Sequence, residues 1–201
     1  MHQIYIASSN PGKLRDFAAA AAAVGVQVAA IPGMDTIPPP EEDAPTFEAN
    51  ACEKAEYYSR RAKGIYVLAD DSGLEVDALN GAPGIHSARY AANASNENAS
   101  DAANNAKLVA ALLDVPDEKR GARYICAIAV ARDGRLLSCF HGSVAGIILR
   151  APRGTGGFGY DPLFYLPEAG RAFGELPPDQ KAEVSHRGKA FRLFLNWFAG
   201  L

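Results

Sequence analysis

The chain has 201 residues, 48% hydrophobic and 21% charged, which is typical of a globular domain that can bury a core. The formal net charge of −3 argues against a nucleic-acid partner, because surfaces that bind polynucleotide phosphates are basic. No apolar stretch is typical of a secretory signal or a membrane span, so we expect a cytoplasmic protein with no membrane partner.

The three cysteines predict a reducing compartment. Cys52, Cys126 and Cys139 are odd in number, and they form no CxxC pair and no recognisable His/Cys ligand spacing. Cys126 and Cys139 lie in apolar runs, so we expect both to be buried thiols. The sequence therefore predicts neither a disulfide framework nor a zinc site.

The amino-terminal part alternates between strand and helix patterns. Residues 4–6 predict a short buried strand that opens at residue 3, and residues 8–13 a turn. An Ala-rich helix is expected over residues 14–24, and a second strand over 27–31. This strand–loop–helix–strand order favours an α/β class.

The next segment leads to two adjacent acids. Residues 32–45 form a loop rich in Pro and acidic residues, and Thr46 suits the N-cap of a helix that reaches about residue 63. Residues 65–69 predict a third strand, which delivers Asp70 and Asp71 at its carboxyl end.

The second half of the chain contains a hairpin pattern between α/β segments. In order, we expect a turn over residues 80–84, a helix over 97–113, a hairpin over 123–149 with its turn at Asp133-Gly134, a Gly-rich loop over 150–162, and a last helix over 186–199 capped by Ser185. The hairpin indicates a mixed sheet, with two lobes around a cleft as one arrangement.

Two polar segments follow predicted strands. Residues 8–13 (Ser-Ser-Asn-Pro-Gly-Lys) precede a helix, whose N-terminal N–H groups and Lys13 attract anions. The Walker A spacing is absent, so an ordinary capped turn is the alternative. Residues 70–73 (Asp-Asp-Ser-Gly) suit Mg²⁺ and could accept a proton from water. Their alternative role is to cap and turn the chain.

Three other segments could contact a ligand. The acidic run at residues 41–43 could supply a further Mg²⁺ ligand, although such runs are usually solvated. Residues 154–161 combine glycines with two aromatic rings that could stack on a flat base, and a plain connection is the alternative. Lys181 and residues 185–189 gather cations, among which Arg187 could hold a base carbonyl or a phosphate. His186 could equally be a structural neighbour of the helix cap.

Together these segments resemble the inosine triphosphatase family of non-canonical purine nucleoside triphosphate pyrophosphatases. The matching stretches are residues 8–13, 46–51, 69–74, 81–90, 156–162 and 185–188, which occur in the family's order over nearly the whole chain. One departure is Ser8-Ser9, where many relatives have Thr-Gly.

The resemblance implies a fold, an activity and an assembly. The fold would be an elongated α/β structure with a mixed sheet and two lobes around a deep central cleft, formed by one domain over residues 1–201. The activity would be Mg²⁺-dependent hydrolysis of ITP, dITP and XTP to the monophosphate and pyrophosphate, which clears deaminated purines from the nucleotide pool. The chain would form a homodimer.

The resemblance also implies residue roles. Asp71 would be the proton acceptor and a Mg²⁺ ligand, and Asp70 would help to orient water or metal. Glu41 would be the second metal ligand, with Glu42 as the alternative. Phe158 would stack on the base. The residues implied to bind substrate are Ser8, Ser9, Asn10, Pro11, Gly12, Lys13, Ser72, Phe158, Gly159, Tyr160, Asp161, Lys181, His186 and Arg187.

Two other classes of function stay open. One is a nucleotide sensor that binds without hydrolysis, against which the acidic pair argues. The other is a broader phosphatase or phosphoryl transferase, which would release orthophosphate instead of pyrophosphate.

Overall fold

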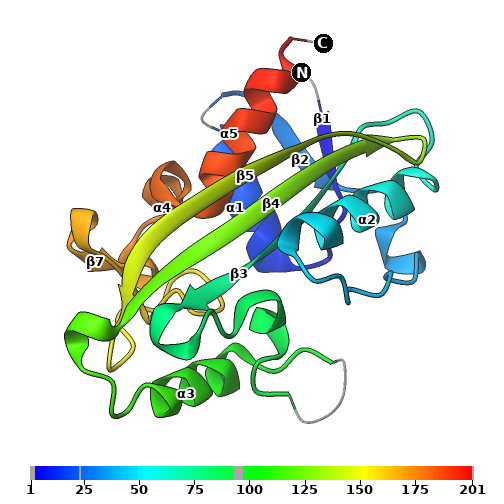
Figure 1. Cartoon of the computed structure of the whole chain (residues 1–201). Coiled ribbons are helices and arrows are strands. Elements are labelled where there is room, and N and C mark those ends of the chain that lie inside the picture. Colours follow the sequence, from blue (N-terminus) through cyan, green and yellow to red (C-terminus); the bar gives the residue numbers. More distant parts are fainter. Residues whose placement is uncertain (1–2, 23, 93–96, 201) are drawn as a thin grey trace. The chain divides into compact units, whose positions relative to one another are not determined.

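The computed structural model describes residues 3–22, 24–92 and 97–200. Its strands form a seven-stranded mixed sheet in the order β2-β1-β3-β4-β5-β6-β7 (Figure 1). The elements are β1 (Gln3–Ile6), α1 (Pro11–Ala22), β2 (Gln27–Ala30), α2 (Phe47–Ser59), β3 (Val67–Val76), α3 (Asp101–Ala111), β4 (Gly121–Arg132), β5 (Arg135–Ile148), β6 (Phe164–Leu166), β7 (Arg171–Ala172), α4 (Pro178–Val184) and α5 (His186–Phe198). The predicted α/β class with a mixed sheet is confirmed. Within the described ranges, no helix has the length and apolar character needed to cross a membrane.

The chain divides into two compact units. The first unit contains Met1–Asp71, Cys126–Ser143 and Ala182–Leu201, and the second contains Ser72–Ile125 and Val144–Lys181. Strand β3 passes from the first unit to the second directly after Asp71, so the candidate residues fall into two groups that are described separately below.

Strand β1 lies between two parallel neighbours in the first unit. It pairs with β2 through Ile4↔Val28 and with β3 through Ile6↔Leu68, which confirms the predicted strands at these places. Helix α1 starts three residues before the predicted residue 14, so the prediction that residues 11–13 belong to a turn is wrong. Pro11 is well suited to the first helical position, because its missing N–H would have no partner there. Ala23, in the predicted helix, lies outside the described residues.

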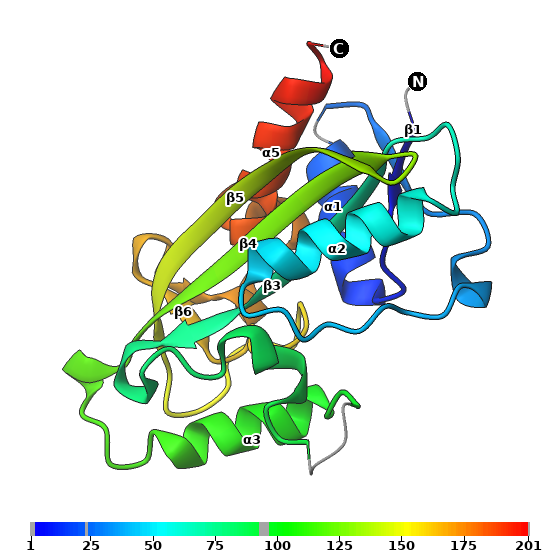
Figure 2. The same ribbon diagram turned by 45° about the vertical axis from the view of Figure 1, so that its right-hand side comes forward.

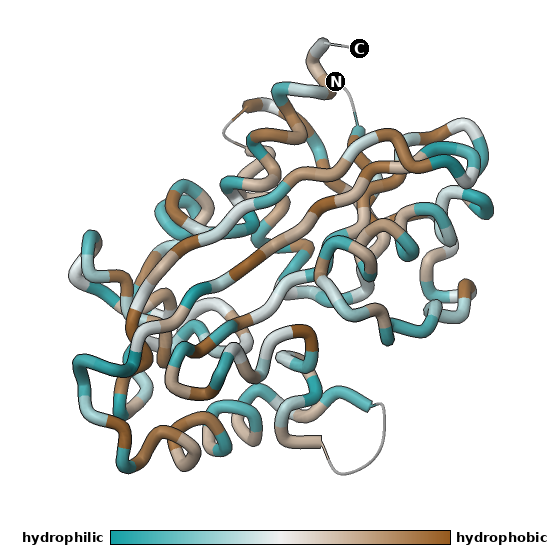
Figure 3. Tube along the Cα trace, in the orientation of Figure 1, coloured by the Kyte–Doolittle hydropathy of each residue, from teal (hydrophilic) through white to brown (hydrophobic). Residues whose placement is uncertain are grey.

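Helices α1 and α5 pack on one face of the first unit's strands. The ring centroids of Phe17 and Phe191 are 5.2 Å apart in an edge-to-face contact. Both rings belong to a buried cluster with the apolar residues of the strands, which include Ile6, Leu68 and Ile128. Figure 3 shows hydrophobic residues along β4, whose residues 126–131 are all buried. The predicted cap of α5 is confirmed, because the Gly188 N–H donates to Ser185 Oγ at 3.1 Å.

Helix α2 covers the opposite face of these strands (Figures 1 and 2). Successive side chains of β5 point to opposite faces of the sheet. Phe140 packs against Phe194 and Trp197 of α5, whereas the next residue, His141, contacts Glu48 of α2. Thr46 caps α2 as predicted, but the helix ends at Ser59, earlier than the predicted residue 63.

The side chains of two cysteines differ in burial. Cys126 is buried as predicted, whereas Cys139 is only partly buried, so that prediction is wrong. Cys139 lies one residue from Phe140 and therefore on the α2 side of β5, where the helix covers it incompletely.

Strand β3 differs most from its prediction. The predicted end of this strand at residue 69 is wrong, because the strand continues without a break to Val76, which also rules out the alternative of a turn at residues 70–73. Alternation places Leu68 and Asp70 on the face covered by α1 and α5, and Asp71 on the face covered by α2. Polar residues that usually favour turns lie within this strand because both faces supply partners for the two carboxylates.

The second unit is built around an aromatic cluster. The ring of Phe164 lies 4.6 Å from that of Tyr124 and 4.9 Å from that of Phe173. Strand β6 joins the antiparallel edge through Ile148↔Phe164. Helix α3 starts at Asp101, four residues after the predicted residue 97, because Ser100 provides the N-cap.

The predicted hairpin of β4 and β5 is confirmed, with the turn residues Asp133 and Gly134 at φ 53° and 82°.

Candidate functional site

The turn before α1 lies at the carboxyl end of β1. Asn10 Oδ1 accepts hydrogen bonds from the N–H groups of Gly12 at 2.8 Å and Lys13 at 3.1 Å. Ser8 Oγ accepts one from the Asn10 N–H at 3.2 Å. Two of the helix's terminal N–H groups are thus used by the cap, which makes the Lys13 ammonium the main positive group of this turn. Carboxyl ends of parallel strands are where α/β proteins usually bind ligands.

Asp70 lies between two cations. Lys13 Nζ is 3.1 Å from its Oδ1, and Arg187 Nη2 is 3.3 Å from its Oδ2. Arg187 in turn donates from Nη1 to Asp16 at 2.7 Å. Burial alone would raise the pKa of Asp70, but Lys13 and Arg187 hold it well below its ordinary value. Asp70 is therefore a fully ionised member of a buried ion-pair network, and a poor proton acceptor.

Arg187, the predicted contact to a base carbonyl or a phosphate, forms ion pairs with two carboxylates of the first unit. Its side chain is buried, and its donors lie against Asp70 and Asp16. Burial alone would lower the pKa of Arg187, but these two carboxylates raise it above its ordinary value. His186, which precedes Arg187 and is also a predicted substrate contact, is buried at the first position of α5.

Asp71 has a different environment on the other face of β3. Asn50 Nδ2 donates to its Oδ2 at 3.0 Å, and Lys54 Nζ lies 3.7 Å from its Oδ1. Burial raises the pKa of the Asp71 carboxyl above its ordinary value, against the opposing effect of Lys54 and Lys13. A carboxylate with a raised pKa is better matched to accept a proton near neutral pH.

Lys54 connects Asp71 to the acidic loop. Its Nζ is 2.7 Å from Glu42 Oε2 and 3.7 Å from Asp71 Oδ1, and its side chain is buried. Burial would lower the pKa of Lys54, but Asp71 and Glu42 raise it. Two carboxylates that already share one cation have the oxygen donors that Mg²⁺ prefers. Glu42 supplies this contact, whereas the predicted ligand Glu41 is exposed.

The second unit holds the other candidate residues around Asp161. Its Oδ2 accepts hydrogen bonds from Lys181 Nζ at 2.7 Å and from the Phe158 N–H at 2.9 Å. Tyr124 donates to Oδ1 at 3.4 Å. Lys181 Nζ also lies 5.0 Å from the centre of the Phe158 ring. A buried ion pair thus fixes the start of the loop that carries Phe158.

The loop around Phe158 needs its glycines. Gly157 has φ +74°, and a Cβ there would lie 2.0 Å from the Asp161 carboxylate. The Gly159 N–H donates to Asp101 Oδ2 at 2.7 Å. Phe158 is half-buried and keeps part of its ring accessible, whereas Tyr160 is buried and donates its hydroxyl to the Ser87 carbonyl at 2.7 Å. Tyr160 therefore supports the loop from inside.

The structure groups many of the predicted residues and adds three. In the first unit, ion pairs join Lys13, Asp70 and Arg187 on one face of β3, and Asp71 forms a separate group with Lys54 and Glu42 on the other face. The second unit joins Phe158, Asp161 and Lys181. Ser72 is half-buried on β3, and Ser9 is exposed. The residues that the sequence prediction missed are Asp16, Asn50 and Lys54. A signal for the last two was available, because both are polar residues on one side of α2 that turns out to be buried.

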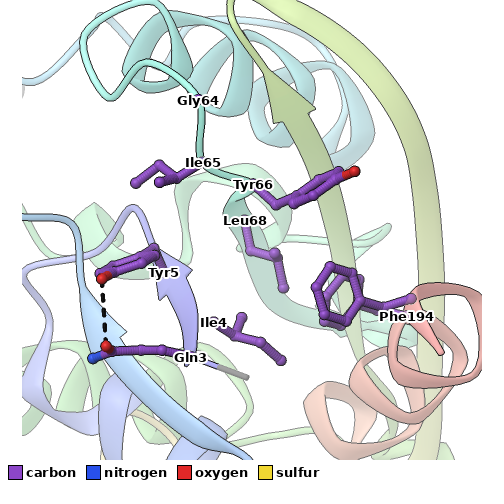
Figure 4. A pocket seen from close by; sticks show the side chains of 9 residues that line it. Gln3, Ile4, Tyr5, Gly64, Ile65, Tyr66, Leu68 and Phe194 are labelled. Atoms are coloured by element: carbon purple, nitrogen blue, oxygen red, sulfur yellow. Dashed lines mark hydrogen bonds between the residues drawn. The ribbon is translucent and has the colours of Figure 1, made fainter. Parts of the chain in front are cut away.

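An apolar pocket in the first unit lies away from these acids. It has a volume of about 240 Å³ and is lined by Ile4, Tyr66, Leu68, Phe194 and other residues (Figure 4). Gln3, at the amino end of β1, also lines the pocket. Lys13 and Asp70 belong instead to the group beyond the carboxyl end of β1. Among the described residues, the lining of the pocket contains no Lys, Arg, His, Asp or Glu, so it lacks the charged groups found around Asp70 and Asp71.

A comparison with protein families decides the identity. The model of the Ham1 family matches residues 4–197. The chain belongs to the Ham1 family. Two solved Ham1 structures have the same fold over the full chain. The Coxiella burnetii HAM1 protein has a TM-score of 0.83 and 37% identity, and covers 100% of both chains. The Staphylococcus aureus Ham1 protein has a TM-score of 0.82 and 40% identity, and covers 99% of both chains.

Curated relatives in the Ham1 family carry one name. A protein of Acidobacterium capsulatum called dITP/XTP pyrophosphatase is 48% identical over 196 residues, which is 96% of each chain. A protein of Geobacillus kaustophilus with the same name is 51% identical over 190 residues, covering 94% of this chain and 91% of the relative. The family assignment agrees with the resemblance predicted from the motifs.

Proposed function

We propose that this Ham1-family chain hydrolyses ITP, dITP and XTP to the nucleoside monophosphate and pyrophosphate. The observation that carries the proposal is the contrast within the acidic pair. Asp71 is a carboxyl with a raised pKa beside Lys54, and Asp70 is an ion-paired carboxylate beside Lys13. A carboxyl that can accept a proton, close to fixed cations, suits the attack of water on a phosphoanhydride, and the names of the relatives agree with this reaction.

In the proposed reaction, Asp71 takes the proton of a water molecule while the water oxygen attacks the α-phosphorus. The bond between the α-phosphorus and the α–β bridging oxygen breaks, and pyrophosphate leaves with that oxygen. Lys13 stabilises charge on the phosphate oxygens, together with Ser8, Ser9, Asn10, Pro11 and Gly12 of the same turn and Ser72 of β3. No covalent intermediate is required.

Asp71 and Glu42 are the proposed Mg²⁺ ligands, with Glu41 as the alternative. Lys54 contacts both Asp71 and Glu42, so the two carboxylates are already arranged around a positive charge. Bound Mg²⁺ would supply neutralisation of the triphosphate charge. The fit rests on oxygen donors, which Mg²⁺ prefers.

The residues of the second unit are proposed to hold the base. Phe158 would stack on the purine, and Gly159, Asp161 and Lys181 would fix the loop and contact its edge, with Tyr160 supporting the loop. Because Arg187 is buried against Asp16 and Asp70, we assign to it the positioning of Asp70. His186 keeps its proposed role of contacting the substrate.

The proposal extends to the whole chain. We propose one catalytic domain over residues 1–201, a homodimer, and a cytoplasmic location in which the nucleotide pool is the substrate source. Sedimentation of the purified protein tests the dimer.

The activity is tested by product analysis. The purified chain is incubated with ITP, dITP, XTP, GTP and ATP at fixed Mg²⁺, and pyrophosphate and orthophosphate are measured separately. We expect pyrophosphate from the first three substrates and much slower turnover of the last two. Orthophosphate as the direct product would contradict the proposal in favour of a phosphatase, and tight binding without either product would favour a sensor.

A further inference from the structure

Three side chains with metal-binding atoms converge between α2 and β5, on the α2 side of the first unit, and a fourth, Cys52, lies next to them. In the part of the chain that the structure describes, Glu48, Cys139 and His141 have ligand atoms that all lie within 4.8 Å of one another. The Cys52 thiol lies beside this group and contributes to the raised pKa of the Cys139 thiol. The mechanism proposed above uses none of these residues.

The spacing in the sequence explains the convergence. Glu48 and Cys52 are four residues apart in α2 and therefore lie one above the other on one side of the helix. Cys139 and His141 are two residues apart in β5 and therefore point to the same face of the strand. The sequence prediction of no zinc site missed this group because each element contributes only a pair, and neither pair alone is a recognised ligand motif.

Two of the distances between ligand atoms lie just below and just above the spacing of a tetrahedral site. His141 Nε2 is 3.0 Å from Glu48 Oε2 and 3.9 Å from Cys139 Sγ. A tetrahedral zinc ion with bonds of about 2.0–2.3 Å places its ligand atoms roughly 3.3–3.8 Å apart. Small side-chain rotations would bring the ligand atoms to that spacing, and the exposed His141 and Glu48 side chains are free to rotate toward solvent.

We propose that Glu48, Cys52, Cys139 and His141 form a binding site for a zinc-class divalent cation. The donor set of two sulfurs, one nitrogen and one oxygen selects Zn²⁺ over Mg²⁺, which prefers oxygen ligands only. The site would fasten α2 to β5. Because α2 also carries Asn50 and Lys54, the two side chains that contact Asp71, the cation would stabilise the helix that positions the proposed proton acceptor.

Cobalt spectroscopy tests the site directly. The whole chain is stripped of metal, kept reduced with a phosphine, supplied with excess Mg²⁺ to occupy oxygen-only sites, and titrated with Co²⁺ as the absorbing substitute for Zn²⁺. We expect intense tetrahedral bands and a thiolate-to-cobalt charge-transfer band that saturate at one equivalent and disappear when Zn²⁺ is added. Absence of the charge-transfer band overturns the proposal.

Variants assign the ligands. Cys139→Ser is expected to weaken cobalt binding at least about 100-fold, and His141→Gln about 10–100-fold, because each loses a direct ligand. Glu53→Gln, an exposed acid on the same helix, is the matched control and should bind as the unchanged chain does. If Cys139→Ser does not fold, as judged by circular dichroism, the exposed His141→Gln variant still decides the question. Unchanged binding by His141→Gln overturns the assignment.

Thermal unfolding gives a second readout. Zn²⁺ at about 100 times its Kd is expected to raise the Tm by about 5–10 °C in the unchanged chain, because it binds only the folded state. The same addition should leave the Tm of the Cys52→Ser, Cys139→Ser double variant unchanged. An equal rise in that variant would show that the ion acts elsewhere, and would overturn the site without affecting the proposed hydrolase function.

Discussion

The two faces of β3 treat adjacent aspartates differently. On the side of α1 and α5, Asp70 has Lys13 and Arg187 as close partners, and its pKa is lowered. On the side of α2, Asp71 has the amide of Asn50 and a more distant ammonium, and its pKa is raised. Two adjacent aspartates thus take different roles, one as a structural anion and the other as a candidate base. The reason is that strand alternation points their side chains toward different helices.

The largest effect is expected for the aspartate on the α2 face of β3, and it concerns the rate of hydrolysis. Asp71→Asn is expected to lower kcat for dITP by about 10³-fold, because the amide can neither accept the proton nor bind Mg²⁺ as a carboxylate does. Initial rates of pyrophosphate release measure it. Asp114→Asn, at an exposed acid, is the control and should keep full activity. A fall of less than tenfold in Asp71→Asn would remove Asp71 from the reaction.

The next largest effect is expected for Asp70, on the face of β3 covered by α1 and α5, and it concerns the stability of the fold. Asp70→Asn leaves the half-buried Lys13 and the buried Arg187 without their shared carboxylate, and is expected to cost about 3 kcal/mol of unfolding free energy. For a chain of this length the Tm should fall by about 6–12 °C. Asp71→Asn should keep or raise the Tm at neutral pH, because it removes a carboxylate whose burial is only partly compensated. Equal losses in both variants would contradict the difference between the faces.

The pH dependence of this stability has a definite sign. The folded pKa of Asp70 lies below its unfolded value, so its contribution is fully present above the unfolded pKa of about 4 and is lost as the pH falls toward the folded pKa. The difference in Tm between the unchanged chain and Asp70→Asn should therefore shrink below about pH 4. Thermal unfolding at a series of pH values measures it.

A third substitution, at Lys54, tests whether the pKa of Asp71 controls the rate of hydrolysis. Because Lys54 lowers the pKa of Asp71, Lys54→Met should move the acid limb of the kcat/KM profile to higher pH. Lys54→Arg keeps the charge and should leave the limb closer to its original position. The profile of dITP hydrolysis against pH measures both variants, and a limb at lower pH in Lys54→Met would contradict the role given to Asp71.

The smallest effect lies in the second unit. Phe158→Leu removes the accessible ring and is expected to raise KM for dITP about tenfold, since stacking on a base contributes about 1–3 kcal/mol. The value of kcat should change little, because the ring is proposed to bind the base and takes no part in the reaction at phosphorus. Phe158→Tyr keeps an aromatic face and should retain a near-normal KM. A fall in kcat with KM unchanged would contradict base binding.

Local patterns predicted the elements better than their partners. The start of β1, the cap of α5 and the hairpin turn at Asp133-Gly134 follow from periodicity and backbone chemistry within a few residues. The strand end predicted at residue 69 is wrong because the composition of residues 70–73 favours turns, and contacts from distant segments stabilise these residues as strand. Local composition contains no information about those segments.

The same limit applies to the candidate site. The motifs identified Lys13, Asp70 and Asp71, but the sequence could not show that Arg187 is 3.3 Å from Asp70, more than a hundred residues before it. Glu41 and Glu42 are adjacent and chemically equivalent in the sequence. Only the folded loop distinguishes them, because it brings Glu42 to Lys54 and leaves Glu41 exposed.

The alternation of β3 also limits how this gene can change. A substitution at Leu68 changes the packing around one side chain, but a deletion of one residue between the start of the strand and Asp70 would reverse every following side chain. Asp71 would then face Arg187, and Asp70 would face Lys54. Lineages that descend from this chain should therefore tolerate altered residue types in this strand more readily than an altered residue count.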